Sequence, residues 1–420
     1  MVALFGRKRV SRPREGEPES GAVAEPPPPS EIADRAEPGA RWRAVIADLS
    51  HAFQPVVNIH SGHTYGLEAL LRGFEAAGFA SAEALFDAAH ADGALAAVDA
   101  ALKEKAVAAY AAWPFGRDRK LFVNVDARLF ADPEHDSLSH TRQVLGAHGL
   151  DEGAVILDIS ERAPFNDFLR AFLREKQTRR SALRYAVDDF GAGLGSLQTL
   201  YGAHPDFIKI DRTLLAGSSE DARKKIFFSH IVSIAHLLGI MVVAEGVENE
   251  TEYFVCKEVG CDLIQGFVVC PPLDRVDAVE REYLCVRDLS RRDRRQSRSD
   301  ERILLERMEA LEPLPLDTRM LEVFERFRAE KARTFFPVVD AAGEPRGIIR
   351  EGDLKEYTYS QFGRDLMTSR AYGRTLEHFV SPCPVASINL AAERILEIFS
   401  GSDNAEGLIL IDGQSRYAGF

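Results

Sequence analysis

Six carboxylate or amide side chains each accompany a short apolar run with the composition of a β-strand. They are Glu68, Asn124, Asp158, Asp188, Asp189 and Glu245. Any one of them could cap a turn, but six at equivalent places indicate a shared site. Carboxylate and amide oxygens are the ligands of hard cations such as Mg²⁺ and Mn²⁺. The sequence therefore predicts a two-metal site of the kind that hydrolyses phosphodiesters.

A lysine lies in one of these apolar runs. In Phe207-Ile-Lys-Ile-Asp211 the strand period of two places Phe207, Lys209 and Asp211 on one face. Because an unpaired ammonium is costly to bury, we expect Lys209 to meet the carboxylates. A glycosidase site needs only one carboxylate pair, which would leave Lys209, Asn124 and the adjacent Asp188 and Asp189 unexplained.

The elements that must position these groups alternate along the chain. We predict strands at residues 53–59, 121–125, 155–159, 184–187, 207–210, 241–244 and 263–269, and helices at 82–113, 165–176 and 222–238. This alternation is typical of βα units around a parallel sheet. About seven such units in roughly 240 residues favour a (β/α) barrel, whose active site lies at the C-terminal ends of the strands.

The C-terminal part contains an internal repeat. Asp340 and Gly347 recur as Asp412 and Gly419, each 72 residues later. The repeat predicts a helix, a strand, a turn and a second strand, occurring twice. Because the second copy stops at Phe420 within its last strand, we expect the chain to be a fragment of a longer protein.

The boundaries follow from composition. We predict a disordered tail at 1–40, which is rich in proline and charge, a barrel at 41–280, a charged helical linker at 281–312 and the repeat pair at 313–420. A net charge of -13 argues against a nucleic-acid polymer as partner. No apolar run approaches the roughly 18 residues of a membrane span. The five cysteines lack metal-type spacing and indicate reduced thiols, so we expect a cytoplasmic protein.

Motifs in residues 45–280 resemble the EAL domain family in order and rough spacing. They are Phe53-Gln-Pro-Val, Gly66-Leu-Glu-Ala-Leu-Leu-Arg72, Phe122-Val-Asn-Val, Val187-Asp-Asp-Phe-Gly-Ala-Gly193, Ile208-Lys-Ile-Asp211, Ala244-Glu-Gly-Val-Glu248 and Gln265-Gly-Phe267. The resemblance implies a modified TIM (β/α)8 barrel. It also implies metal-dependent hydrolysis of cyclic di-GMP to linear pGpG in bacterial second-messenger signalling.

The resemblance further implies roles for individual residues. Two Mg²⁺ or Mn²⁺ ions would be held by Glu68, Asn124, Asp158, Asp188, Asp189 and Glu245, with Lys209, Glu245, Glu68 and Asp189 as the catalytic group. Gln54, Arg72 and Gln265 would bind substrate, and Glu161 would steady the loop after Asp189.

The chain departs from the family pattern at the third metal ligand. Asp158 stands where most members have Glu, and its carboxylate is shorter by about 1.5 Å. Ala192 replaces the usual Thr in the loop after the paired aspartates, and Leu194-Gly195 replaces a more polar pair. Either Asp158 fails to reach the first metal, and Asp158→Glu would improve metal binding, or the backbone has shifted and Glu would crowd the site. These departures make a binding-only cyclic di-GMP receptor the alternative function.

The C-terminal repeat resembles a tandem CBS module. That resemblance implies an adenine nucleotide in the cleft between the copies, with Asp353 on its ribose, or a homodimer, and leaves the two roles equally open. Arg350 stands where Thr or Ser is usual. The chain has no GGDEF motif, so we do not expect cyclase activity.

Overall fold

The computed structural model describes residues 39–116, 119–131, 137–160, 183–191, 200, 202, 204–293, 307–354, 376–400 and 407–420. Several predictions therefore lie outside the described residues. They are the tail up to residue 38, the helix at 165–176, Glu161, and the loop residues Ala192, Leu194 and Gly195.

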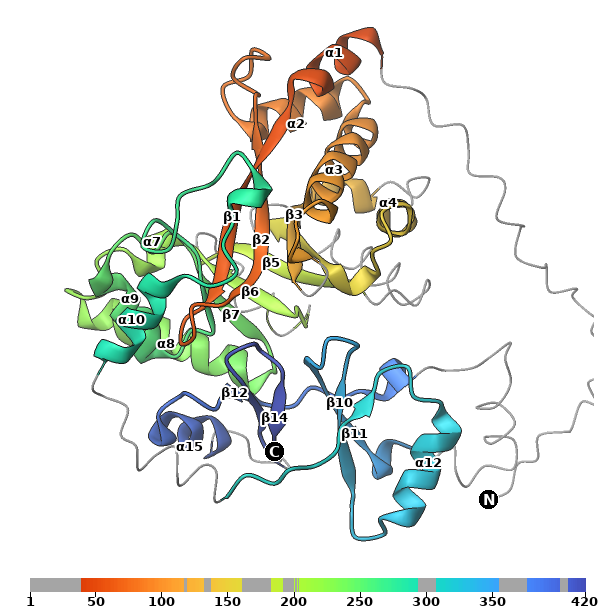
Figure 1. Ribbon diagram of the computed structural model, residues 1–420, viewed down its shortest axis with the longest axis vertical. Coiled ribbons are helices and arrows are strands. Elements are labelled where there is room, and N and C mark those ends of the chain that lie inside the picture. Colours follow the sequence, from red (N-terminus) through yellow and green to blue (C-terminus); the bar gives the residue numbers. More distant parts are fainter. Residues whose placement is uncertain are drawn as a thin grey trace, which may run out of the picture. The chain divides into compact units, whose positions relative to one another are not determined.

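Eight strands close into a barrel (Figure 1). They are β1 (Ser50–Asn58), β2 (Thr64–Arg72), β3 (Lys120–Asn124), β4 (Val155–Ser160), β5 (Arg184–Phe190), β6 (Phe207–Ile210), β7 (Met241–Ala244) and β8 (Leu263–Ile264). Strands β2 to β8 pair in parallel, whereas β1 is antiparallel to both of its neighbours. The predicted barrel is confirmed, with one inverted strand.

Two details of the barrel differ from the predicted strands. The run at 263–269 forms only the two-residue strand β8, because the chain turns at Gly266, whose φ is 148°. Strand β2 lies outside the predicted runs, since Gly66 and Glu68 interrupt its apolar pattern.

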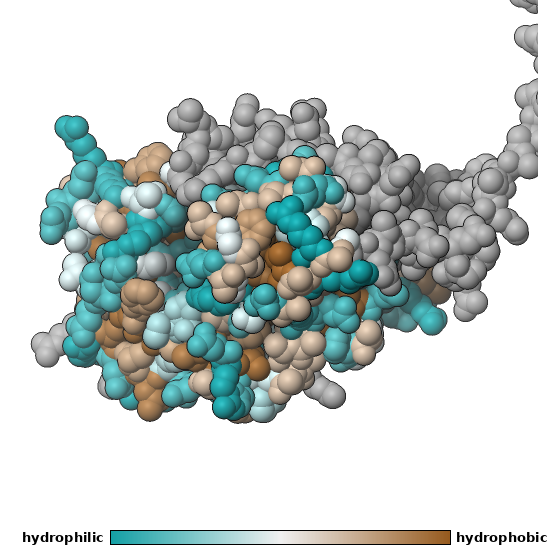
Figure 2. All heavy atoms as spheres, turned by 90° about the horizontal axis from the view of Figure 1, so that it is seen from above, coloured by the Kyte–Doolittle hydropathy of each residue, from teal (hydrophilic) through white to brown (hydrophobic). Residues whose placement is uncertain are grey.

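Helices follow most strands and cover the outside of the barrel. They are α1 (Ala40–Asp48), α2 (Ala82–Ala91), α3 (Leu95–Ala111), α4 (Ser137–Ala147), α7 (Arg212–Leu215), α8 (Ala222–Leu237), α9 (Glu250–Val259) and α10 (Leu284–Arg292). The single helix predicted at 82–113 is wrong, because the chain breaks at Gly93, whose φ of 69° suits glycine. Hydrophilic and hydrophobic residues are interspersed on the face shown in Figure 2. Among the described helices, none is long and apolar enough to cross a membrane.

The C-terminal part contains two copies of one βαββ unit. The first has β9 (Leu314–Pro315), α12 (Met320–Ala329), β10 (Phe335–Val339) and β11 (Pro345–Arg350), and the second has β12 (Val385–Ser387), α15 (Ala392–Ser400), β13 (Ile409–Ile411) and β14 (Tyr417–Gly419). In each copy the first strand pairs in parallel with the second, which pairs antiparallel with the third. The 72-residue repeat is confirmed. The helix predicted for the linker does not extend to residue 312, since 308–313 are not helical.

An apolar layer fills the inside of the barrel between its two ends. It is made by Val56, Tyr65, Phe122, Ile156, Ala186, Phe207, Met241, Val243 and Leu263, all of which belong to one buried cluster. Gly66 lies at the edge of this layer. A Cβ on Gly66 would come within 2.6 Å of the Lys120 carbonyl oxygen and 3.0 Å of the Phe122 ring. Strands β2 and β3 therefore approach each other only because residue 66 has no side chain.

We predict that Gly66→Ala lowers the free energy of unfolding by about 2 kcal/mol, because the added methyl overpacks a rigid contact. Gly146→Ala is the matched control, since a Cβ there meets nothing within 4 Å and residue 146 lies in the last turn of α4. The control should be neutral or stabilising by up to about 1 kcal/mol. Urea denaturation of both variants checks this, and equal midpoints would contradict the close approach.

Candidate metal centre

Four carboxylates surround the Lys209 ammonium inside the barrel. The Lys209 Nζ lies 2.8 Å from Glu245, 2.9 Å from Asp158, 3.0 Å from Glu68 and 3.3 Å from Asp188. The Lys209 side chain is fully buried. The sequence argument that this lysine must meet carboxylates is confirmed. We call these five residues, together with Asn124, Gln54 and Gln265, the acidic layer.

The strand order of the barrel explains why these residues meet. Glu68, Asp158, Asp188 and Lys209 belong to β2, β4, β5 and β6, and Glu245 directly follows β7. Parallel strands end at the same rim, and every second residue points to the barrel axis. The acidic layer therefore lies directly above the apolar layer, at the C-terminal end.

Gln265 and Asn124 donate hydrogen bonds to Glu68, and Gln54 supports Gln265. The Gln265 side-chain amide donates to Glu68 Oε2 at 2.6 Å and to Gln54 Oε1 at 2.9 Å, and Gln54 in turn donates to the Cys270 carbonyl at 3.1 Å. Asn124 donates to Glu68 Oε1 at 3.3 Å. Sequence reasoning assigned Gln54 and Gln265 to substrate. In the structure both are buried, Gln265 bonds to Glu68 and Gln54 bonds to Gln265, and their contact with substrate stays a prediction.

The electrostatics of the acidic layer favour a charged lysine. Burial alone would lower the pKa of Lys209, but the negative fields of the four carboxylates, Asp158 foremost, raise it well above its usual value. Burial also raises the pKa of Asp158 well above its usual range, although Lys209 opposes the shift. Burial and then the charge of Asp188 raise the pKa of Glu245 in the same direction. Four carboxylates that repel one another thus surround a single ammonium. A bound cation would reduce this repulsion.

The donor set fits a divalent cation. Oxygens of Glu68, Asp158 and Asp188 all lie within 4.8 Å of one another. Asp158 Oδ1 is buried and has no hydrogen-bond partner among the described residues, so an acceptor is left there for an ion or a water. A set made only of oxygen ligands is typical of Mg²⁺, Mn²⁺ or Ca²⁺ sites.

Asp189 occupies a strained position beside this group. Its φ of 56° is unusual for a residue that is not glycine, and its backbone N–H donates to Asp188 Oδ1 at 2.9 Å. Its carboxylate accepts from Ser160 Oγ at 3.3 Å. Sequence reasoning missed Ser160. It could have been found from its position two residues after Asp158, on the same face of the strand. Of the four carboxylates on Lys209, none belongs to Asp189.

Arg72 ends β2, four residues after Glu68. Its guanidinium is half-buried and donates to the carbonyl of its neighbour Leu71 at 2.9 Å. Arg72 therefore lies at the C-terminal end of β2. Its contact with a substrate phosphate stays a prediction. Glu161, expected to steady the loop after Asp189, lies outside the described residues.

Comparisons with known proteins agree with the fold. A family model described as the EAL domain matches residues 43–272. An uncharacterized protein of Azorhizobium caulinodans is 32% identical over 227 residues, which is 52% of this chain and 31% of the relative. The bifunctional diguanylate cyclase/cyclic di-GMP phosphodiesterase MucR of Pseudomonas aeruginosa is 28% identical over 225 residues, 53% of this chain and 32% of the relative.

A solved structure shows the same fold. The EAL enzyme Bd1971 in its cGMP-bound form is 23% identical, with a TM-score of 0.50 over 56% of this chain and 64% of that chain. The chain spans about a third of the length of the two curated relatives. Nothing in these comparisons identifies a CBS module in the C-terminal repeat. The family model covers more than half of the 420 residues, and the chain belongs to the EAL domain family.

Proposed function

We propose that this chain hydrolyses one phosphodiester bond of cyclic di-GMP to give linear pGpG, with two Mg²⁺ or Mn²⁺ ions. The observation that carries the proposal is the group of Glu68, Asp158 and Asp188 oxygens within 4.8 Å of one another beside a buried lysine. Membership of the EAL family and similarity to a protein named as a cyclic di-GMP phosphodiesterase support the substrate.

The residues of the acidic layer would divide the work. Glu68, Asp158 and Asp188 would hold the ions, together with Asn124, Asp189 and Glu245. When bound, the ions would supply positive charge to the phosphodiester and make a water molecule more acidic. Gln54 and Gln265 would keep Glu68 in place through their hydrogen bonds.

Lys209 and Glu245 would act on the attacking water. The Lys209 ammonium stays charged and can orient a water by donating to it. Glu245 lies 2.8 Å from Lys209 and is the most exposed of the four carboxylates, with 19% of its side chain accessible. It is therefore the carboxylate best placed to accept a proton at the mouth of the barrel. Arg72 would contact a phosphate of the substrate.

We also propose that the C-terminal repeat is regulatory, through an adenine nucleotide or through homodimerisation. Its two copies of one βαββ unit support a two-lobed binding module. Asp353, the residue expected on the ribose, accepts a hydrogen bond from Ser381 Oγ at 3.3 Å in an exposed position.

We predict that Glu68→Gln and Lys209→Met each lose at least about a hundredfold in pGpG formation, because each removes a group that acts on the water or its ions. Chromatography of the products of cyclic di-GMP with Mn²⁺ measures this, and circular dichroism checks folding. Lys225→Met is the control, because Lys225 pairs with Glu258 on the surface, and should keep its activity. Cyclic di-GMP binding without pGpG at any Mn²⁺ or Mg²⁺ concentration would contradict the activity and favour a receptor.

The contacts of Asp158 favour the second of its two expectations, a backbone position adapted to Asp. Its carboxylate lies as close to Lys209 as that of Glu68 does, at 2.9 Å against 3.0 Å, and its side chain has no accessible surface. We infer that the backbone position suits Asp, so that a longer side chain would crowd the Lys209 ammonium and the neighbouring carboxylates.

We predict that Asp158→Glu does not lower the Mn²⁺ concentration needed for half-maximal activity, because a further methylene overpacks a filled site. Asp158→Asn, which keeps the size and removes the charge, should raise that concentration about tenfold or more. Titration of activity with Mn²⁺ compares the three proteins. If the native protein needed a higher Mn²⁺ concentration for half-maximal activity than the Glu variant, the Asp158 carboxylate would be too short to reach the metal.

A further inference from the structure

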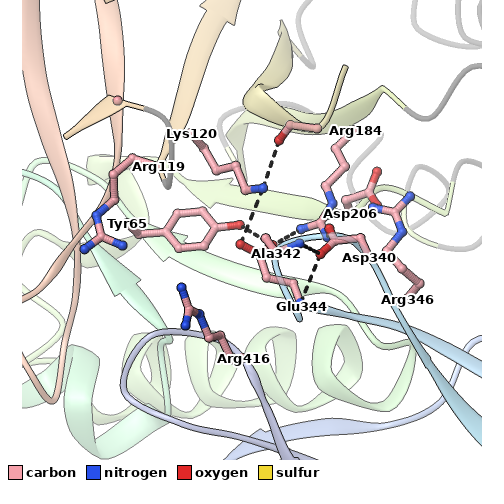
Figure 3. A network of polar contacts seen from close by, with 12 residues as sticks. Tyr65, Arg119, Lys120, Arg184, Asp206, Asp340, Ala342, Glu344, Arg346 and Arg416 are labelled. Carbon is pink, nitrogen blue, oxygen red and sulfur yellow. Dashed lines mark hydrogen bonds and ion pairs between the residues drawn. The ribbon is translucent and has the colours of Figure 1, made fainter. Parts of the chain in front are cut away.

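The acidic turn between β10 and β11 reaches the N-terminal end of the barrel. The Arg184 guanidinium pairs with Asp340 and with Glu344. The Tyr65 hydroxyl donates to Glu344 at 3.0 Å, and the Lys120 ammonium lies 3.6 Å from the same carboxylate (Figure 3). We call these five residues the floor network. It joins the starts of β2, β3 and β5 to the C-terminal repeat.

A further ion pair at the N-terminal rim of the barrel, which we call the rim contact, connects a fourth barrel strand, β6, to the C-terminal repeat. The Arg346 guanidinium of β11 lies 3.1 Å from Asp206, the residue that precedes β6. Asp206 also accepts a hydrogen bond from the backbone N–H of Tyr185 in β5, at 3.1 Å. One acidic residue thus ties the start of the strand that carries Lys209 to the start of the strand that carries Asp188.

Four of the five residues of the floor network are buried, and the fifth, Asp340, keeps 16% of its side chain accessible. Arg184, Lys120, Glu344 and Tyr65 are 3%, 5%, 5% and 6% exposed. Burial alone would raise the pKa of Asp340, but Arg184 and then Lys120 hold it below its usual value. A buried charge that loses its partner is strongly destabilising. The acidic turn therefore supplies the counter-charges of Arg184 and Lys120, although the Lys120 ammonium also donates to the Gly153 carbonyl of the barrel at 2.8 Å.

The apolar layer of the barrel continues into the repeat. Five apolar residues of the repeat belong to the same buried cluster as the barrel interior, namely Ile348, Cys383, Val385, Ile409 and Ile411. In an isolated barrel this end of the apolar layer would face water. The C-terminal repeat thus closes the end of the barrel opposite the acidic layer.

The same strands carry the floor network and the acidic layer. On β5 the period of two places Arg184, Ala186 and Asp188 on the inner face, and on β3 it does the same for Lys120, Phe122 and Asn124. Four residues of strand span about 13 Å. A shift at the floor of β3 or β5 would therefore displace a residue of the acidic layer on the same short strand, Asn124 or Asp188.

We propose that docking of the C-terminal repeat through the floor network positions β3, β5 and β6 and so sets the affinity of the acidic layer for divalent metal. Arg184 and Lys120 are positioning residues, since they act through Asp188 and Asn124. The proposal rests on the metal site of the proposed function, but it does not depend on the substrate or on turnover.

The test uses the full chain carrying Asp340→Asn and Glu344→Gln, which keep the shapes of the side chains and remove both charges. We expect Mn²⁺ to bind about fivefold to tenfold more weakly in calorimetry, with faster amide hydrogen exchange in β5. Glu312→Gln is the matched control, because Glu312 pairs with Arg326 on the surface of the same repeat at 3.0 Å and is 80% exposed. Its Mn²⁺ affinity should equal that of the native protein.

Other results would overturn the proposal. Unchanged Mn²⁺ affinity, with or without faster exchange in β5, would show that the repeat has no influence on the acidic layer. If the double variant does not fold, Arg346→Gln breaks only the rim contact and is judged by the same two measurements. The calorimetry contains no substrate, so its result is independent of turnover. A protein that binds Mn²⁺ but forms no pGpG in the separate activity assay would refute the proposed function and leave this inference standing.

Discussion

The arrangement of the barrel depends on one buried ammonium. Lys209 lies within 3.3 Å of four carboxylates inside the barrel, and its ammonium opposes the burial and mutual repulsion that raise the pKa of Asp158 and Glu245. Its position on β6 fixes where β2, β4 and β5 and the turn after β7 must end relative to one another. The cost of burying these charges is offset only while all five groups stay in register. This requirement agrees with the hydrogen bond that Gln265 donates to Glu68 and with the bond between Gln265 and Gln54 that supports it.

Three layers of side chains follow one another along the barrel axis, a charged layer, an apolar layer and a second charged layer. The acidic layer occupies one end, the apolar layer lies in the middle, and the floor network with Arg184 and Lys120 occupies the other. The cations of the floor find their partners in the C-terminal repeat, whose apolar strands extend the interior of the barrel. Barrel and repeat are therefore physically continuous through the same strands that present the acidic layer.

The sequence predicted the barrel and the residues around Lys209, because strand period and the cost of an unpaired charge are local rules. It did not predict that Gln54 and Gln265 bond to each other, or that Glu344 reaches Arg184, 160 positions earlier in the chain. Such contacts depend on the closure of the barrel and the docking of the repeat, which no short motif encodes. Bond lengths alone left open whether Asp158 reaches a metal, because the position of its carboxylate depends on where β4 lies.

The most direct test of the account is the location of Mn²⁺ in crystals of the full chain, measured by anomalous scattering at the manganese absorption edge. Our account predicts peaks within coordination distance, about 2.0 to 2.3 Å, of oxygens of Glu68, Asp158 and Asp188. Manganese that binds only outside the barrel, with Lys209 still surrounded by its four carboxylates, would contradict the assignment of the acidic layer as a metal centre.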